Sequence, residues 1–259
     1  MKYVRNSLIF LAVLVLSAGL LLWFLPARWV VPWVEPQLHG IQLQQVQGLL
    51  WNGRANRVQS PAGQTLGRLH WRLSRSALWG QVRLRLDFSG PKLAFNGTMR
   101  RLADGRMQWH KTSLQADLGS LEVLAAAGFG QPQGELRATV DQALLQGGWP
   151  LQLQAQAQWQ HAVMQTQAGA VALGNLEVLA QARGGVITAQ LHDDGHGPLQ
   201  VDSQLQLSPI GWRLDATLRP RQTDPVLHRW LSRFGSADAD GTVHIHHHGG
   251  LASGLPSRS

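Results

Sequence analysis

Four histidines close to the C-terminal end are the residues whose type and spacing come nearest to a metal site. The segment HIHHHGG contains His244, His246, His247 and His248. In a strand, His244 and His246 would share one face, and their imidazoles would suit a borderline metal ion. Such a site needs three or four converging ligands, and the segment has no cysteine and few carboxylates beside it. We therefore predict no metal site and expect an exposed polar strand end, with the role of the cluster left open.

The segment SADADG resembles the first half of a calcium-binding loop. Ser236, Asp238, Asp240 and Gly241 occupy the first, third, fifth and sixth positions of that pattern. The twelfth position of such a loop normally holds a glutamate that binds calcium through both oxygens, and here that position is His247. The segment therefore predicts a turn between a helix and a strand.

The chain carries no familiar nucleophile or phosphate-binding motif. G-x-S-x-G, G-x-x-x-x-G-K-[ST] and a G-x-G-x-x-G between a strand and a helix are all missing from the sequence. The 15 acidic residues lie mostly in expected turns, which disfavours a paired-carboxylate site. We therefore expect a protein that is not an enzyme, with no catalytic residue and no cofactor.

Eleven tryptophans are a different kind of signal. Trp23, Trp29 and Trp33 adjoin an apolar N-terminal segment, and the other eight are dispersed at expected strand and turn positions. The simpler interpretation is that they fill the core beneath a sheet, and the alternative is a row of aromatics that contacts a partner strand or a lipid chain. The candidate partner-binding or structural residues are Gly48, Trp51, Gly53, Trp71, Trp79, Trp212, Trp230 and Gly241.

The composition narrows the class of protein. The 259 residues include 44% hydrophobic and only 15% charged residues, and the net charge is +8. The basic residues are spread along the chain without a lysine- or arginine-rich run, so nucleic acid is not an expected partner. The absence of cysteine excludes both a disulfide framework and a thiolate metal site.

Residues 7–25 form a stretch of 19 residues without a charged side chain. As a helix they would span roughly 28 Å, close to the ~30 Å hydrocarbon core of a bilayer. Lys2 and Arg5 precede the stretch, so the positive-inside rule places a tail of residues 1–6 in the cytoplasm. A cleaved signal peptide is the alternative, but a weak site at 15–17 would leave an apolar segment on the mature chain. We expect an uncleaved single-pass transmembrane helix.

The long middle of the chain predicts strands and turns. Apolar and polar residues alternate, so each segment would have one apolar and one polar face. We expect a mainly β fold, in which the transmembrane helix is followed by an extended, curved, mostly antiparallel sheet, an open roll or half-barrel. The alternating segments are 41–46, 68–73, 81–88, 151–160, 187–192, 199–207 and 211–218.

The boundaries of this β domain are set by changes in composition. Residues 26–40 contain Pro26, Pro32 and Pro36 and predict a proline-rich linker that does not continue a helix. The β domain is expected over 41–248, with a flexible tail over 249–259.

Asn-Gly and Asp-Gly pairs separate the strands and are typical of hairpin turns. We predict a tight hairpin at the first pair, with a positive φ at Gly53. The pairs are Asn52-Gly53, Asn96-Gly97, Asp104-Gly105, Asp194-Gly195 and Asp240-Gly241.

One or two short helices and an internal duplication are also expected. A helix is predicted over 223–235, with Asp224 as its cap, and a weaker one over 120–128. The octamer LGSLEVLA at 118–125 returns as LGNLEVLA at 173–180, where we interpret it as a strand. A duplicated strand–turn–strand unit is expected at about 118–153 and 173–216.

Several Gly- and Trp-bearing blocks follow the apolar N-terminal segment in a specific order. They are GLLWNGRA (48–55), LGRLHWRLSRSALWGQVRLRL (66–86), GPLQVDSQLQLSPIGWRLDATLRPR (197–221) and VLHRWLSRFGSADADGTVHIHHHGGL (226–251). In this order the chain resembles the type II secretion system protein N family, also called general secretion pathway protein N. The resemblance covers nearly the whole chain, and the middle, about 90–190, matches less clearly.

The resemblance implies a bacterial inner-membrane protein whose bulk is periplasmic. It implies a non-catalytic bitopic component that scaffolds the secretion platform, associates with the L and M proteins, and contacts membrane lipid through 7–25. The platform would export folded proteins across the outer membrane. The alternative is an AsmA-like lipid-handling protein, which the repeated amphipathic strands also resemble and which would have an apolar groove.

Overall fold

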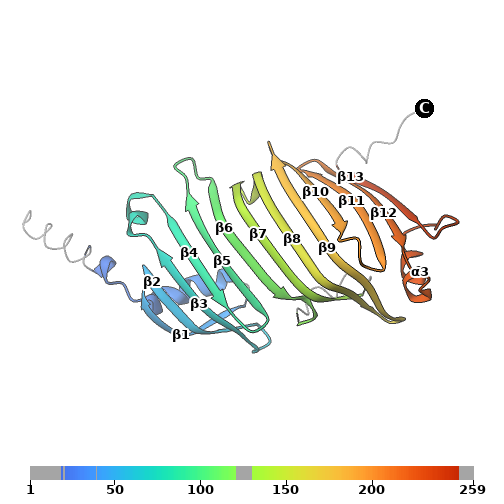
Figure 1. The fold of residues 1–259 in the computed structure, drawn as a ribbon. Helices are drawn as coiled ribbons and strands as arrows, with labels where there is room; N and C mark the ends of the chain where they lie inside the picture. The colour runs from blue at the N-terminus through green and yellow to red at the C-terminus, as the bar shows by residue number, and fades with distance from the viewer. Residues whose placement is uncertain (1–18, 20, 39, 121–129, 251–259) are drawn as a thin grey trace, which may run out of the picture. The chain divides into compact units, whose positions relative to one another are not determined.

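Strands dominate the computed structural model of the chain. Residues 1–91 and residues 92–259 form two compact units, each of which is described by itself. Within each unit, every strand pairs antiparallel with its neighbour in the chain, so the strand order follows the sequence (Figure 1). The prediction of a mainly β, antiparallel fold is confirmed. The structure describes residues 19, 21–38, 40–120 and 130–250.

The first unit contains a four-stranded antiparallel sheet. A short 3₁₀ helix, η2 (Arg75–Trp79), connects its last two strands, and the Ser74 side chain caps that helix by accepting a hydrogen bond from the Ser76 N–H. Alternation along the last two strands places leucine and phenylalanine on one face and charged side chains on the other. The strands are β1 (Gln42–Leu49), β2 (Asn52–Gln59), β3 (Thr65–Leu73) and β4 (Arg83–Ser89).

The helical residues 21–23 do not continue into the proline-rich stretch over 26–40, but this stretch forms helices of its own that the sequence did not predict. This stretch contains helix α2 (Ala27–Val34) and the 3₁₀ helix η1 (Glu35–Leu38). Pro26 lies just before α2 in an extended conformation, where its fixed φ and missing N–H interrupt nothing. Pro32 lies inside α2, which ends two residues later. Packing of α2 against β1 stabilises a helix that its own hydrogen bonds alone would not.

The predicted transmembrane helix over 7–25 lies largely outside the described residues, as do the tails over 1–6 and 251–259. Residues 21–23 are helical. In the part of the chain that the structure describes, no helix is both long enough and apolar enough to cross a membrane.

The second unit is an open antiparallel sheet whose described strands run in order from β5 to β13. Its strands are β5 (Leu93–Arg101), β6 (Met107–Asp117), β7 (Gln131–Gln146), β8 (Trp149–Thr166), β9 (Gly169–Arg183), β10 (Val186–Asp193), β11 (Leu199–Ser208), β12 (Gly211–Pro220) and β13 (Val243–Gly250). A 3₁₀ helix, η3 (Leu118–Ser120), follows β6. Because β13 extends through Gly249 and Gly250, these two residues do not belong to the tail that the sequence predicts.

Helix α3 (Pro225–Leu231) builds the main core of the second unit, and it confirms the helix predicted over 223–235. Asp224 caps it, because Oδ1 accepts a hydrogen bond of 2.8 Å from the Val226 N–H. Leu227 and Leu231 are fully buried among apolar residues of β9, β11, β12 and β13. The other predicted helix, over 120–128, lies outside the described residues except for Ser120.

The glutamine stripe at 151–160 lies in β8 and confirms the predicted strand. The glutamines at 152, 154, 156 and 158 are exposed, while Leu151, Leu153 and Trp159 lie on the opposite face. These apolar side chains are half-buried rather than buried, and Trp159 packs against the core cluster that contains Leu227 and Leu231 of α3. The alternation is therefore correct, and the expected depth of burial is wrong.

Three of the predicted Asx-Gly turns are confirmed. Asp104-Gly105 joins β5 to β6, Asp194-Gly195 joins β10 to β11, and Asp240-Gly241 precedes β13. All three glycines have a φ between +82° and +85°. This left-handed conformation is the one in which glycine is favoured.

The other two Asx-Gly pairs lie inside strands, so those turn predictions are wrong. Asn52 and Gly53 begin β2, and Gly53 does not have the predicted left-handed φ. The turn lies at residues 50–51 instead, and Gly48 takes the positive φ of 88°. Gly97 lies at a register shift in β5, where a glycine permits a bulge and the close approach of the Thr112 side chain.

The two blocks of internal similarity form equivalent local structures where they are described. Residues 134–153 form the hairpin of β7 and β8, and residues 197–216 form the hairpin of β11 and β12. The octamer at 173–180 is part of β9, as predicted, while its counterpart at 118–125 is described only over η3.

Candidate functional site

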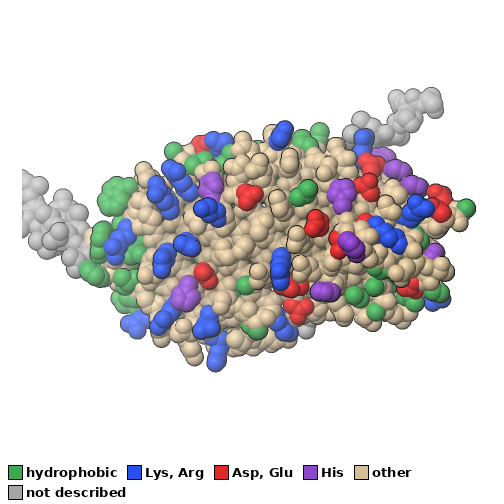
Figure 2. All heavy atoms as spheres, viewed as in Figure 1, with side chains coloured by type: hydrophobic (Ala, Val, Ile, Leu, Met, Phe, Trp, Pro, Cys, Tyr) green, Lys and Arg blue, Asp and Glu red, His purple; other side chains and the backbone are tan. Residues whose placement is uncertain are grey.

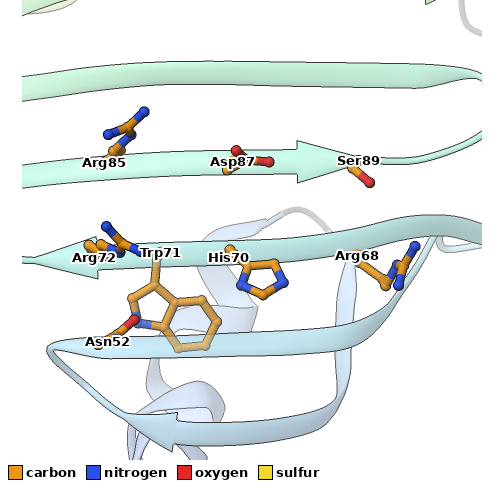
Figure 3. Close-up of a pocket in the computed structure, with 8 residues that line it drawn as sticks. All are labelled: Asn52, Arg68, His70, Trp71, Arg72, Arg85, Asp87 and Ser89. Carbon is orange, nitrogen blue, oxygen red and sulfur yellow. The ribbon is translucent and has the colours of Figure 1, made fainter.

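A basic hollow of about 470 Å³ lies on the polar face of β2, β3 and β4 (Figure 3). We call it the arginine hollow. It is lined by Asn52, Arg68, His70, Trp71, Arg72, Arg85, Asp87 and Ser89.

Strand register brings the arginines of this hollow together. Arg72 of β3 lies directly opposite Arg85 of β4, and opposite Asn52 of β2 on its other side. Arg68 lies on the same face of β3, opposite Ser89. Like charges directly opposite each other in a sheet repel, so the Arg72–Arg85 pair is unfavourable unless an anion lies between the two guanidinium groups.

Acidic side chains do not balance these arginines. Ten of the 23 basic residues and two of the 15 acidic residues lie in residues 1–91, which gives the first unit a net charge of +8. The second unit has thirteen of each and a net charge of zero. Every ion pair that forms among the described residues lies in the second unit. Figure 2 shows Lys and Arg side chains gathered over β2, β3 and β4. The net charge of the chain therefore resides in the unit that carries the hollow.

The β1–β2 hairpin forms one end of the hollow. The Trp71 Nε1 donates a hydrogen bond of 3.0 Å to the Leu50 carbonyl in the hairpin turn. Gly53 lies opposite Trp71, and a Cβ atom there would lie 2.7 Å from the indole Cε2. A side chain at residue 53 would therefore displace the Trp71 indole, which lies on the opposite face of β3 from Arg68 and Arg72.

The same hairpin holds the N-terminal helical residues. Trp51 is buried, and its Nε1 donates a hydrogen bond of 3.0 Å to the Leu22 carbonyl. The Leu50 N–H donates one of 2.9 Å to the Leu25 carbonyl. The Arg75 guanidinium lies 4.2 Å from the ring centre of Trp23, within range of a cation–π interaction. The chain that leads out of residues 7–25 is therefore attached directly to the sheet.

Four of the predicted site residues meet in this region. Gly48, Trp51, Gly53 and Trp71 all belong to the β1–β2 hairpin or to the strand beside it. Gly48 allows the two strands to approach, because a Cβ there would lie 2.6 Å from the Asn52 carbonyl oxygen. Trp79 lies in η2 of the same unit, and three quarters of its surface is exposed.

The other three predicted site residues lie in the second unit and do not join one another in a site. Trp230 is buried in α3, with its ring 4.8 Å from that of Phe234. Trp212 lies on β12 against the backbone of Gly249 in β13. Gly241 lies in the turn that precedes β13. Trp230 and Trp212 therefore have the surroundings of packing residues, and Gly241 has those of a turn residue.

The histidine cluster lies on the exposed face of β13 and forms separate pairs. His246 Nδ1 is 2.9 Å from Asp215 Oδ1, and His244 Nε2 is 3.4 Å from Asp238 Oδ2. Within the described ranges, no three His, Cys, Asp or Glu side chains are placed so that they could hold a metal ion.

The predicted turn at SADADG is present, and the side chain of its Asp240 forms a hydrogen bond within the turn. Asp240 Oδ1 accepts a hydrogen bond of 3.0 Å from the Thr242 N–H. This hydrogen bond, helped by nearby Arg219, holds the pKa of Asp240 below its usual range. The acid therefore closes the turn that leads into β13.

Arg68, Arg72 and Arg85 are the functional candidates that sequence reasoning missed. Their signal is present in RLHWRL and VRLRLDF, where arginines recur on the polar parity of each strand. The alternation along a strand shows only on which face of the sheet each arginine lies. Only the register between β3 and β4 places Arg72 opposite Arg85.

The chemistry of the hollow is that of anion binding. Guanidinium groups bind carboxylate and phosphate oxygens through paired, charge-assisted hydrogen bonds. The hollow also contains Ser89, His70 and Asp87, which are the residue types of a nucleophilic triad; in the strand register His70 lies opposite Asp87, and Ser89 lies opposite Arg68. The arginines of the arrangement suit recognition of an anionic group.

Comparisons with known proteins agree with the resemblance of the quoted blocks. Residues 39–246 match the model of the family described as type II secretion system (T2SS), protein N. The chain is also 28% identical over 251 residues to a type II secretion system protein N from Aeromonas hydrophila, covering 91% of this chain and 95% of that protein. No solved structure matches the chain.

Proposed function

Because the chain belongs to the type II secretion system protein N family, we propose that it is a non-catalytic, bitopic inner-membrane component that scaffolds the secretion platform. The observation that carries this proposal is the family match, which extends through both units, from residue 39 to residue 246. Export of folded proteins across the outer membrane is the process that the platform would serve.

The architecture supports a scaffold. In both units the strands form an open sheet whose polar face is exposed over successive strands. Such a face offers a broad surface to a partner, whereas an enzyme needs convergent reactive groups. The arginine hollow is the part of this surface that we assign to partner contact.

The expected partners are the L and M proteins of the platform. An acidic segment of such a partner would place carboxylates beside Arg72 and Arg85, which lie directly opposite each other on β3 and β4. We further propose that residues 7–25 anchor the chain in the inner membrane, with residues 1–6 in the cytoplasm and both units in the periplasm. The uncharged stretch and the basic residues before it support that topology.

We do not propose the AsmA-like lipid-handling function, because the family match assigns the same strands to a secretion component.

The proposal is tested by complementation of a strain that lacks the protein. Wild-type chain, an Arg72→Gln/Arg85→Gln double variant and an Arg100→Gln control would be compared for secreted protein in the culture medium and for co-purification of the L and M proteins. Arg100 is an exposed arginine of β5 outside the hollow. The double variant should lose partner and secretion together, and the control should keep both. Full secretion in the absence of the wild-type chain would refute the proposed function.

A further inference from the structure

Helix α2 has apolar residues on all sides. Its sequence is ARWVVPWV, with Arg28 as its one charged residue. Ala27 is buried against the unit and Val31 is half-buried, while Trp29 and Trp33 face outward. These two tryptophans are four residues apart and therefore share one face of the helix. A surface helix in water normally presents polar side chains on its outer face, so the solvent face of α2 is anomalous.

Further large apolar side chains are exposed in the same unit. Leu78 and Trp79 project from η2, and Trp23 and Phe24 are exposed where the N-terminal segment enters the unit. The contact of Arg75 with Trp23 ties η2 to that point of entry. Figure 2 shows hydrophobic side chains gathered along the edge of the first unit where the chain enters. We call Trp23, Phe24, Trp29, Trp33, Leu78 and Trp79 the tryptophan patch.

We infer that the tryptophan patch inserts into the interfacial layer of an anionic phospholipid bilayer, so that the first unit lies against the membrane. Tryptophan is the side chain that favours the boundary between headgroups and hydrocarbon, and four of the six patch residues are tryptophans. Exposed Trp33 retains 77% of its accessible surface and Trp79 retains 75%, which is ample for insertion. The contact is additional to the proposed spanning segment, because α2 and η2 lie outside residues 7–25.

Charge favours the same occupant. Without Lys2 and Arg5, which the proposed topology places in the cytoplasm, the first unit has eight basic and two acidic residues, a net charge of +6, and the second unit has none, so an anionic surface attracts the first unit selectively. The course of the chain also supports contact with the bilayer, because the uncharged stretch over 7–25 ends at the patch. The hydrogen bonds from Trp51 and Leu50 hold that end against the sheet. The inference rests on the proposed membrane location of the chain.

The chain contains no cysteine, which permits site-specific labelling of the full-length protein. Val34→Cys and Leu78→Cys variants keep every tryptophan and report from α2 and η2. Ile210→Cys is the matched control, because Ile210 is an apolar residue of the second unit with 69% exposure. Each variant would be labelled with an environment-sensitive dye and reconstituted into phosphatidylcholine vesicles with about 30% phosphatidylglycerol, with or without spin-labelled quencher lipid.

We expect at least about twofold stronger lipid quenching at residues 34 and 78 than at residue 210. Omission of phosphatidylglycerol, or addition of Trp29→Ser, Trp33→Ser and Trp79→Ser together, should weaken the quenching at residue 78. Equal quenching at all three sites would overturn the inference. Shielding of residues 34 and 78 from solvent without lipid quenching would also overturn it, because it would indicate a protein partner or a second copy. A chain that floats with vesicles but is not quenched at the patch refutes only this inference, whereas a chain that does not float refutes the proposed anchor as well.

Discussion

The indole of Trp71 lies against Gly53, its direct neighbour across the β2–β3 pair. A Cβ atom on Gly53 would lie 2.7 Å from the indole Cε2 and 2.9 Å from the Leu49 carbonyl oxygen. Gly53 does not adopt a left-handed φ. The position therefore needs glycine for close approach and not for a turn.

Gly53→Ala should destabilise the protein by about 1–3 kcal/mol, because the added methyl group overpacks the contact with Trp71. In a Trp71→Leu background the same substitution should cost less, since the smaller side chain leaves room. Urea unfolding of the four proteins of this cycle measures the coupling. An undiminished cost in the Trp71→Leu background would assign the effect to the Leu49 carbonyl instead.

Arg85→Gln should leave the protein as stable as before or more stable by a few tenths of a kcal/mol, because it removes the charge opposite Arg72. The gain should shrink as added salt screens the repulsion. Thermal melts at low and high ionic strength test this, with Arg100→Gln as the control because Arg100 lies opposite Gln108. A clear loss of stability in Arg85→Gln would mean that the arginine pair is not repulsive.

Leu153→Gln should destabilise the second unit by about 1–3 kcal/mol, because Leu153 lies on the apolar face between Ala143 and Ala182, which are both buried. Gln154→Leu, one residue away on the exposed face, should change stability by less than about 0.5 kcal/mol. Urea midpoints of the two variants decide between the faces. The opposite order would show that the glutamine face is the covered one.

Asp193 should make stability sensitive to acid. Its burial would raise its pKa, but hydrogen bonds from Arg221 at 2.6 Å and from the Val201 and Gly195 N–H groups outweigh burial and hold the pKa below its usual range. A carboxyl with a lowered folded pKa stabilises the protein above its unfolded pKa, about 4, and loses that contribution as the pH falls through its folded pKa. Stability measured by urea at stepwise lower pH should therefore fall below about pH 4.

Asp193→Asn tests the assignment. The variant should be less stable at neutral pH by about 1–3 kcal/mol, because the Arg221 guanidinium loses its charged partner. Its stability should then fall less steeply below about pH 4 than that of the wild type. Parallel pH profiles of the two proteins would contradict the role of this carboxyl.

Leu227→Ala should destabilise the second unit by about 2–5 kcal/mol, because the side chain is fully buried between α3 and the sheet. Leu179→Ala is the matched control on β9, where almost half of the leucine surface is exposed, and it should cost less than about 1 kcal/mol. Calorimetric midpoints compare the two. Equal effects would mean that α3 does not hold the core.

Alternation with a period of two was sufficient to predict strands such as β3, β8 and β11, because one face of each is drier than the other. Alternation did not reveal the start of β2, because Asn52-Gly53 has the composition of a turn and was predicted as one. Turn chemistry describes a local preference, and here the packing of Trp71 over Gly53 prevails. Helix α2 was also not predicted, because the contacts that stabilise a helix around Pro32 come from packing against β1 and not from the sequence of the helix itself.

The candidate site was predictable only in part. The hairpin residues Gly48, Trp51 and Trp71 stand out by type, and they do meet. The arginines opposite one another do not stand out, because cross-strand pairing depends on the length of each connection. The η2 turn between β3 and β4 sets the register that joins Arg72 to Arg85. A shift by two residues would preserve the same alternation and separate the two charges.

The strand order has a consequence for how the protein is made. Within each unit, every described strand finds its partner in the strand just before it, across a short connection for most pairs. Chain closure over short loops is fast, and no strand has to await a distant segment before it pairs. A chain that emerges progressively, with its amino end first, can therefore pair each new strand with the edge strand of the part that is already folded. This topology permits vectorial folding while the rest of the chain is still being made.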